Sequence, residues 1–571
     1  MLEGLMQDYP LTLAHLLERM RTLNRDAQVA TLSEQGTTRA SFADVAARSD
    51  RIAHALRTLA VEDGARIGTF AWNNQRHFEL YMAVPCTGAV LHTLNIRLAS
   101  RQLAYIINHA EDDLIFVDAS LVELLAPLAE ELRTVRHFIV MGDGEQARAS
   151  AAQLPRALCY EDLLADAPEE PFAYPQLSER QAAALCYTSG TTGNPKGVLY
   201  SHRSISLHSM ASLLRDALGM GREDRVLVVV PMFHANAWGM PHAAALCGAD
   251  LILPDRFLQA EPLARLIEAE HPTIMGCVPT IFQDLLRYAD AHDSDLASLA
   301  NAACGGSAVP RALMEAFEER HKVRIFQAWG MTETSPVATY ARPAEAGAHD
   351  ERYWQARAKQ GRPLPWVEAR IVAADGSVLP WEGTSAGELE VRGPWIARRY
   401  FREEGSEERF DEGWLRTGDV AVIGPDGFVQ ITDRAKDVIK SGGEWISSVE
   451  LENEVMSHPD VVEAAVIAKP DERYDERPLC CVVLRPGVLS ERSAEAVAAE
   501  LIAHLSERVA RWWLPDEFAF VTEVPKTSVG KFDKKELRRQ LQEGTLQGRV
   551  TTKRPPAEVR SAVGQEVQAQ A

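Results

Sequence analysis

Short runs of β-branched and aromatic residues alternate with longer, helix-like stretches along most of the chain. Residues 66–72 (RIGTFAW) are typical of a buried strand, and a helix is predicted directly afterwards, at residues 75–84. Further on, a helical segment begins near Pro310, a residue suited to the first turn of a helix. This alternation favours an α/β fold with largely parallel sheets flanked by helices. Other strand-like runs are DLIFVD, HFIVMG, RVLVVVP, ADLILP, PTIMGCVP and RIFQAWG.

The length of the chain, 571 residues, is too great for one hydrophobic core and predicts several domains. Glycine-punctuated, β-like pieces follow residue 365, so we expect a large N-terminal domain, residues 1–433, that ends in a small β-rich subdomain at about 365–433. Helical and strand patterns mix again in a small α+β C-terminal domain, residues 434–545. Residues 546–571 lack aromatic residues and hydrophobic periodicity, which predicts a disordered tail.

The composition limits the classes of partner. With 60 basic and 81 acidic side chains the formal net charge is −21, which repels nucleic acid and anionic membranes, so a polyanionic substrate needs a local site. The 8 cysteines are scattered without a CxxC pair, which favours small buried side chains in a reducing compartment. No signal peptide and no apolar run near ~18 residues is present, so we expect a cytoplasmic protein without a stable membrane anchor.

One loop gathers residues that are suited to phosphate binding. The segment from Tyr187 to Gly197 (YTSGTTGNPKG) combines glycines, hydroxyls and a lysine. Glycines let backbone N–H groups approach an anion closely, hydroxyls add donors, and Lys196 adds positive charge. The loop differs from the P-loop of nucleotide hydrolases, because Gly197 follows the lysine where that pattern needs Ser or Thr. The candidate phosphate-binding residues are Thr188, Ser189, Gly190, Thr191, Thr192, Gly193 and Lys196.

This string resembles the phosphate-loop signature of the adenylate-forming enzymes, which include acyl-CoA synthetases, luciferases and peptide-synthetase adenylation domains. The resemblance extends from about residue 10 to 540 and includes WGMTET at 329–334, where Trp329 replaces the family's usual tyrosine. It makes Thr188 and Glu333 candidate Mg²⁺ ligands, and a carboxylate suits this hard cation. The residues that it places at the adenylate in this region are Gly306, Ser307, Ala308, Gln327, Ala328, Trp329, Gly330, Met331 and Thr332.

Two further motifs extend the resemblance toward the C-terminus. Asp419, in GWLRTGD, would bind the ribose hydroxyls. In DRAKDVIKSGGEW, at 433–445, the family has the hinge of a mobile C-terminal domain. The resemblance implies that Arg434 meets the nucleotide, that Lys436 is the hinge residue, that Lys440 and Trp445 approach the adenylate, and that Gly442 and Gly443 leave room for the pantetheine arm of coenzyme A.

Lys531, in PKTSVGKFDKK, matches the family's catalytic lysine of adenylation. Such a cation can bridge the attacking carboxylate and the α-phosphate as charge builds. The implied reaction forms an acyl-adenylate from ATP with release of pyrophosphate, and the thiol of coenzyme A then displaces AMP. Between these steps, the resemblance implies a rotation of the C-terminal domain about Lys436. This rotation would move Lys531 away from the reacting centre and bring Gly442 and Gly443 toward it. Similar fatty-acyl ligases form homodimers, so a homodimer is also expected.

The segment PMFHANAWG, at 231–239, lies where the family builds its acid pocket. Amino-acid-activating members carry an aspartate where His234 aligns, and histidine cannot supply that anion, which favours an uncharged aliphatic or fatty acid. Trp238 resembles the aromatic gate of bacterial fatty-acyl-CoA synthetases, so His234, Trp238 and Gly306 are candidate pocket residues. The motifs are most similar to those of medium- and long-chain fatty-acyl-CoA ligases and of 3-methylmercaptopropionyl-CoA ligase.

Three other functions share parts of this pattern. A luciferase-type enzyme would pass the adenylate to oxygen, and a loading enzyme would pass it to a separate carrier protein. A regulatory protein could bind the nucleotide without catalysis, although the presence of Lys531, Glu333 and Asp419 argues against this.

Overall fold

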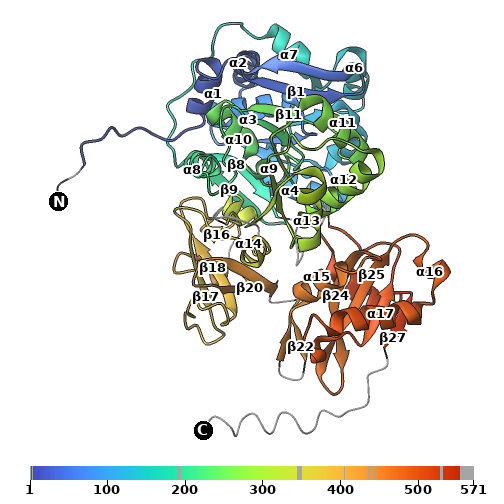
Figure 1. Ribbon diagram of the computed structural model, residues 1–571. Helices are drawn as coiled ribbons and strands as arrows, with labels where there is room; N and C mark the ends of the chain where they lie inside the picture. The colour runs from blue at the N-terminus through green and yellow to red at the C-terminus, as the bar shows by residue number, and fades with distance from the viewer. Residues whose placement is uncertain are drawn as a thin grey trace. The chain divides into compact units, whose positions relative to one another are not determined.

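The computed structural model describes residues 2, 4–188, 194–343, 350–403, 405–434, 437–441, 444–527 and 531–552, with the backbone alone at 444 and 445 (Figure 1). The chain divides into two compact units. The first contains Met1–Ile431 together with Thr527–Lys531, and the second contains Thr432–Lys526 and the chain from Phe532 onward. The sequence placed this boundary after residue 433. Within the described part of the chain, none of the helices has the length and apolarity that are needed to cross a membrane.

One sheet of the first unit has the strand order β7-β6-β5-β3-β4-β8-β9 and is parallel except for the β8–β9 pair. The predicted strand at 66–72 is β3, and the predicted helix at 75–84 is α3, whose first turn is capped by Asn74. These strands are β3 (Arg66–Phe70), β4 (Val90–Thr93), β5 (Asp112–Asp118), β6 (His137–Met141), β7 (Ala157–Cys159), β8 (Ala182–Tyr187) and β9 (Gly197–Ser201).

A second sheet of this unit has the order β16-β15-β14-β13-β12-β10-β11-β1-β2. Its central strands β14 to β1 are parallel, and antiparallel pairs close both ends. The helix expected near Pro310 is α13, for which Pro310 is the N-cap. The strands are β1 (Gln28–Ser33), β2 (Gly36–Ser41), β10 (Arg225–Val228), β11 (Asp250–Leu253), β12 (Ile274–Cys277), β13 (Asn301–Gly305), β14 (Ile325–Gly330), β15 (Val337–Tyr340) and β16 (Arg362–Pro363).

Amphipathic helices cover these sheets, as the α/β pattern predicts (Figure 1). Apolar side chains of α11, α12 and α13, such as Ile267, Phe282 and Phe317, pack in one core with strand residues such as Met275. The longer helices are α1 (Ala14–Arg21), α2 (Phe42–Thr58), α3 (Gln75–Cys86), α4 (Ser100–Ala110), α6 (Gly144–Ala151), α7 (Tyr160–Asp166), α8 (His202–Ser212), α10 (Met240–Cys247), α11 (Ala260–Glu270), α12 (Pro279–His292), α13 (Arg311–His321) and α14 (Glu351–Arg357).

A small antiparallel sheet occupies the region where the β-rich subdomain was expected. Its order is β17-β18-β20-β19, and β21 also pairs with β20. The strands are β17 (Glu368–Val372), β18 (Gly387–Arg392), β19 (Phe410–Asp411), β20 (Trp414–Ile423) and β21 (Val429–Arg434).

The second unit is an α+β structure with the sheet order β23-β22-β25-β26-β27, in which β24 also pairs with β25. Helices α15 and α17 pack their apolar residues, such as Leu451 and Leu501, on this sheet. Its main elements are β22 (Ile439–Ser441), β23 (Glu444–Ile446), α15 (Ser448–Met456), β24 (Val461–Asp471), β25 (Asp475–Leu484), α17 (Ala494–Ser506), β26 (Glu517–Phe520), α18 (Lys534–Gln542) and β27 (Arg549–Thr551).

The prediction that a disordered tail begins at residue 546 is wrong for residues 546–552. Leu546 is buried, and β27 pairs antiparallel with β26. Arg549 also donates a hydrogen bond to Glu517 Oε2 at 2.9 Å. Backbone pairing and one ion pair hold this strand, and neither requires the hydrophobic periodicity that was missing from the sequence. Residues 553–571 lie outside the described residues.

A group of enclosed histidines in the first unit predicts acid sensitivity. Burial lowers the pKa of His77, His202 and His208 to about 4, and that of His234 and His242 to about 3. Unfolded histidines titrate near 6.5, so below that pH the unfolded chain binds protons that the native state does not, and stability falls. Asp118 acts in the opposite direction, because burial raises the pKa of its carboxyl group to about 7 and stability is lost as pH rises toward that value.

We expect the histidines to outweigh Asp118, so the free energy of unfolding should decrease between pH 7 and pH 5. His242→Phe should reduce this decrease by about 2 kcal/mol, the share of one histidine whose pKa is lowered to about 3. Denaturant unfolding of both proteins at the two pH values measures the difference. Parallel pH profiles for the variant and the wild type would contradict the prediction.

Candidate active site

The predicted phosphate loop connects β8 to β9, and its two ends are joined by hydrogen bonds. The Thr188 N–H donates to the Lys196 carbonyl at 2.9 Å, and the Lys196 N–H donates to Thr188 Oγ1 at 3.1 Å. Gly197 continues into β9. The predicted residues Ser189, Gly190, Thr191, Thr192 and Gly193 lie outside the described residues. The motif therefore begins at the end of a buried strand, and the hydrogen bonds between Thr188 and Lys196 close the base of the loop.

Lys196 and Glu333, from two separate motifs, meet around Tyr400. The Lys196 Nζ lies 2.6 Å from Glu403 Oε1 and 4.8 Å from the centroid of the Tyr400 ring. The Tyr400 hydroxyl donates to Glu333 Oε1 at 2.6 Å. Sequence reasoning missed Tyr400 and Glu403, since they lie in ARRYFREE, which has no motif character of its own. Burial and the Glu333 carboxylate raise the pKa of Tyr400, so it stays a hydrogen-bond donor at neutral pH.

The surroundings of Glu333 fit the cation that the sequence predicts. The residue is 4% exposed, and among the described residues no basic side chain forms an ion pair with it. A buried carboxylate is stable when it pairs with a cation or coordinates a metal. Glu333 and the Thr188 hydroxyl are hard oxygen donors of the kind that Mg²⁺ prefers. The chemistry of both residues therefore suits a magnesium ion.

Trp329 and Asp419, the adenosine and ribose candidates, are in direct contact. Trp329 is in β14 and Asp419 is in β20, and both side chains are buried. The indole Nε1–H donates to Asp419 Oδ2 at 2.9 Å. Asp419 is fixed further by its N–H, which donates to Thr417 Oγ1 at 3.1 Å. Tryptophan at position 329 therefore supplies a hydrogen-bond donor to Asp419.

The adjacent ends of β13 and β14 carry the remaining adenylate candidates. Gly305 pairs with Ala328, and Gly306 has a φ of +92°, a conformation that favours glycine. Ser307, which is exposed, and Ala308, which is half-buried, follow this turn. At Gly330, an added Cβ would lie 1.9 Å from the Pro336 carbonyl oxygen, so only glycine fits there.

Hydrogen bonds fix several of these residues within the fold. The buried Gln327 amide donates to the Ala358 carbonyl at 2.6 Å and accepts from the Val309 N–H at 3.1 Å. The Met331 N–H donates to Thr334 Oγ1 at 2.9 Å, and the Thr332 carbonyl accepts from the Tyr200 hydroxyl at 2.6 Å. The side chain of Gln327 is therefore committed within the fold.

The acyl-pocket candidates His234 and Trp238 lie between β10 and α10, where the Trp238 indole packs on two glycines, and the third candidate, Gly306, follows β13. A Cβ added to Gly276 would lie 3.5 Å from the Trp238 indole, and a Cβ added to Gly305 would lie 3.2 Å from it. Burial lowers the pKa of His234 to about 3, and nearby Lys531 and Arg97 contribute, so His234 is neutral at physiological pH. A small cavity of about 10 Å³ is lined by Ser212, Ala217, Leu218, Trp238, Met240, Ala303, Ala328, Val337, Tyr340 and Leu364.

The C-terminal candidates are placed only in part. The first unit includes Thr527–Lys531, and an added Cβ on Gly306 would lie 3.3 Å from Lys531 Cε. Arg434 ends β21. In the second unit, Lys440 is in β22 and its N–H donates to Glu476 at 2.8 Å. The predicted hinge residue Lys436, the coenzyme A candidates Gly442 and Gly443, and the side chain of Trp445 lie outside the described residues.

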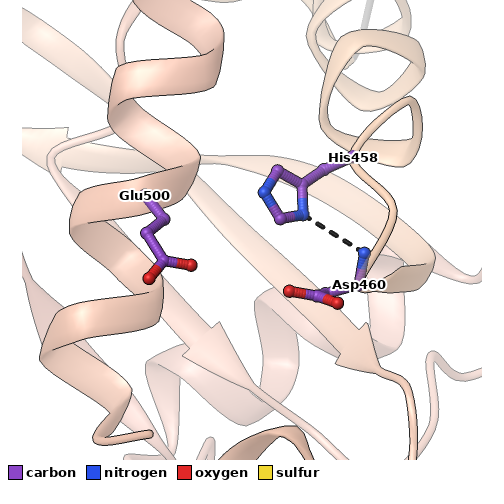
Figure 2. Close-up of side chains that lie close together, drawn as sticks. All are labelled: His458, Asp460 and Glu500. Atoms are coloured by element: carbon purple, nitrogen blue, oxygen red, sulfur yellow. Dashed lines mark hydrogen bonds between the residues drawn. The ribbon is translucent and has the colours of Figure 1, made fainter.

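A separate group of possible metal ligands in the second unit consists of His458, Asp460 and Glu500 (Figure 2). His458 Nδ1 accepts a hydrogen bond from the Asp460 N–H at 3.2 Å. Arg492 pairs with both carboxylates. A metal ion would have to displace this guanidinium group, so the three residues are better explained as an ion-pair network.

Comparison with known proteins covers nearly the whole chain. The family model for the AMP-binding enzyme matches residues 19–401, and the model for the AMP-binding enzyme C-terminal domain matches residues 450–531. The 3-methylmercaptopropionyl-CoA ligase of Ruegeria lacuscaerulensis is 42% identical over 538 residues, which are 94% of this chain and 98% of that protein. The medium-chain-fatty-acid–CoA ligase of Ectopseudomonas oleovorans is 41% identical over 542 residues, 94% of this chain and 97% of that protein.

The fold is likewise similar to that of solved enzymes. The anthranilate CoA ligase AuaEII, crystallised with anthranoyl-AMP, superposes with a TM-score of 0.84 at 26% identity, over 94% of this chain and 99% of that one. The large and small units described above therefore have counterparts in an enzyme whose structure contains an acyl-adenylate.

Proposed function

The chain belongs to the family of AMP-binding enzymes, and on this basis we propose that it is an ATP-dependent acyl-CoA synthetase. It activates a carboxylic acid as an acyl-adenylate, releases pyrophosphate and transfers the acyl group to coenzyme A. The observation that carries this proposal is the convergence of motifs that are distant in the sequence: Lys196 and Glu333 meet at Tyr400, and Trp329 meets Asp419. Resemblance to CoA ligases over more than nine-tenths of the chain supports coenzyme A as the acceptor.

In the proposed first step, the carboxylate attacks the α-phosphorus of ATP and pyrophosphate leaves. Enzymes of this kind work mainly by positioning and by neutralising charge. Lys196 and the phosphate loop hold the phosphates, Asp419 orients the ribose, and Trp329 fixes Asp419. Lys531 neutralises charge at the reacting centre. Mg²⁺, held by Thr188 and Glu333, would neutralise phosphate oxygens when it is bound.

In the proposed second step, the thiol of coenzyme A attacks the acyl carbon and AMP leaves. We assign Lys436 to the hinge about which the C-terminal domain rotates between the two half-reactions. Gly442 and Gly443 are assigned to the passage of the pantetheine arm. Arg434, Lys440 and Trp445 are assigned to the nucleotide and adenylate.

The acid that the site favours is an uncharged aliphatic one. His234 is neutral at physiological pH, because burial lowers its pKa to about 3, and it offers no anion for a substrate ammonium group. The cavity beside Trp238 is lined almost entirely by apolar side chains. A medium- or long-chain fatty acid, or a short thioether acid such as 3-methylmercaptopropionate, fits this chemistry.

The test is acid-dependent pyrophosphate release with ATP and Mg²⁺, screened from propionate to palmitate and including 3-methylmercaptopropionate, with and without coenzyme A. A preferred acid whose turnover rises with coenzyme A is expected. Release that is indifferent to coenzyme A would leave adenylation in place and favour a separate carrier protein or oxygen as the acceptor. Absence of release with every acid would contradict the proposed function.

Trp238→Ala is expected to shift the chain-length preference toward longer acids. The existing cavity of about 10 Å³ holds no acyl chain, and removal of the indole would extend it along Gly276 and Gly305. A single methylene in an apolar pocket changes specificity by about 10–200-fold, so the shift in kcat/KM should be large. Comparison of kcat/KM over the acid series measures it, and an unchanged profile would remove Trp238 from the pocket.

A further inference from the structure

The segment that presents Trp238 has an unusual backbone. Ala235, Asn236, Ala237 and Trp238 have φ angles of 43°, 52°, 50° and 55°, and Gly239 follows at 74°. Residues other than glycine avoid this left-handed region at a cost of roughly 1–2 kcal/mol each, and asparagine tolerates it better than alanine or tryptophan. Such a run persists only where surrounding contacts hold it, and strained backbone of this kind is concentrated at functional sites.

One contact that holds this left-handed turn comes from Asn236. The residue is buried, with 3% exposed, and its Oδ1 accepts a hydrogen bond from Cys186 Sγ at 3.3 Å. Cys186 is in β8, two residues before Thr188 at the base of the phosphate loop. The hydrogen bond therefore ties the turn, which follows a strand of one sheet, to a strand of the other sheet.

Packing holds the two ends of the turn. At Gly239, an added Cβ would lie 2.7 Å from His208 Nδ1, so α8 packs directly against the backbone. Trp238 lies with its indole against Gly276 of β12 and Gly305 of β13. Because Trp238 is only two residues from Asn236, the position of the indole depends on the left-handed conformation that Asn236 tolerates and anchors.

The second polar group of Asn236 argues against a purely structural role. Its Nδ2 has no hydrogen-bond partner among the residues that the structure describes. An unsatisfied buried donor costs about 1–3 kcal/mol, and glycine at this position would avoid this cost while adopting the left-handed conformation without strain. Folding alone therefore does not require the asparagine amide at this position.

We propose that Asn236 is a positioning residue for acid selectivity, an inference that rests on the proposed function. Its hydrogen bond with Cys186 fixes the left-handed turn and thereby fixes Trp238, which lines the apolar cavity, against Gly276 and Gly305. The same bond holds the acid-binding segment against β8. Asn236 acts through Trp238 and does not contact the reacting atoms.

The test uses Asn236→Gly, because glycine adopts the left-handed conformation without strain but lacks the amide. We expect the KM for the preferred acid to rise about tenfold and the preference between neighbouring chain lengths to flatten, as for a loss of ground-state positioning, while the KM for ATP stays within about twofold. Cys186→Ala should reproduce this pattern, and Cys186→Ser, whose hydroxyl can donate, should restore the wild-type pattern.

A double-mutant cycle separates positioning from folding. If Asn236 acts through Trp238, Asn236→Gly should leave the acid profile of Trp238→Ala unchanged, since coupled residues are not additive. Wild-type acid KM and profile in both Asn236→Gly and Cys186→Ala would overturn the proposal. An equal loss for acid and ATP together with a lower Tm would also overturn it, by assigning Asn236 to folding alone. A wild-type protein that is inactive with every acid would instead overturn the proposed function, and this inference with it.

Discussion

Lys531→Met should slow acid-dependent adenylation by about 10²–10³-fold, because it removes a cation from the centre where charge develops. In the first unit, Lys531 Cε lies beside Gly306, at the end of β13 where the acyl and adenylate candidates adjoin. Thioester formation from supplied acyl-adenylate and coenzyme A should keep most of its rate. Pyrophosphate release measures the first half-reaction, and AMP release from purified acyl-adenylate measures the second.

The same segment offers a matched control. Lys526 is paired with Glu463 at 2.6 Å in the second unit, so Lys526→Met removes an equal charge from an ion pair of that unit. It should leave adenylation close to the wild-type rate. Equal losses in both half-reactions of Lys531→Met, or equal losses in the two variants, would contradict the assignment of Lys531 to adenylation.

Glu333→Gln should reduce adenylation by at least about 10²-fold and raise the Mg²⁺ concentration that gives half-maximal rate. The substitution keeps the shape of the side chain and an oxygen that can accept from Tyr400, so the local fold is preserved. It removes the buried negative charge, for which the described residues provide no ion-pair partner. Titration of the rate with Mg²⁺ at saturating ATP, together with calorimetric ATP binding with and without Mg²⁺, measures both effects.

Glu403→Gln is the control for this charge. It removes the carboxylate that lies 2.6 Å from Lys196 but leaves Glu333 in place. Its Mg²⁺ requirement should match that of the wild type. A Glu333→Gln variant with an unchanged Mg²⁺ requirement would exclude Glu333 as a metal ligand, whatever its rate.

Local patterns in the sequence were sufficient to predict many elements and candidate residues. The strand at 66–72 and the helix after it appear as β3 and α3, because hydrophobic periodicity depends on neighbouring residues alone. The helix near Pro310 appears as α13 for the same reason. Motif residues such as Glu333 and Asp419 were identified because their neighbours in the chain carry the pattern.

Contacts between distant segments could not be read from these local patterns. Trp329 and Asp419 are separated by 90 residues, and Tyr400 lies between two motifs without belonging to either. Strand β27 also escaped prediction, because pairing with β26 stabilises it and its own residues do not mark it as a strand. The contacts of the Gln327 amide with Val309 and Ala358 were likewise not predictable from local patterns, and its role at the adenylate stays a prediction.

By itself, the sequence determined the α/β class, the membership in the adenylate-forming enzymes and the candidate residues for the chemistry, because these depend on periodicity and on contiguous motifs. Only the tertiary structure decided that Tyr400 joins Lys196 to Glu333 and that four consecutive residues before Gly239 adopt a left-handed conformation. The physical reason is that a side-chain contact depends on where the sheets place their strand ends. Likewise, an intrinsically unfavourable backbone conformation is stable only when contacts from distant parts of the chain hold it.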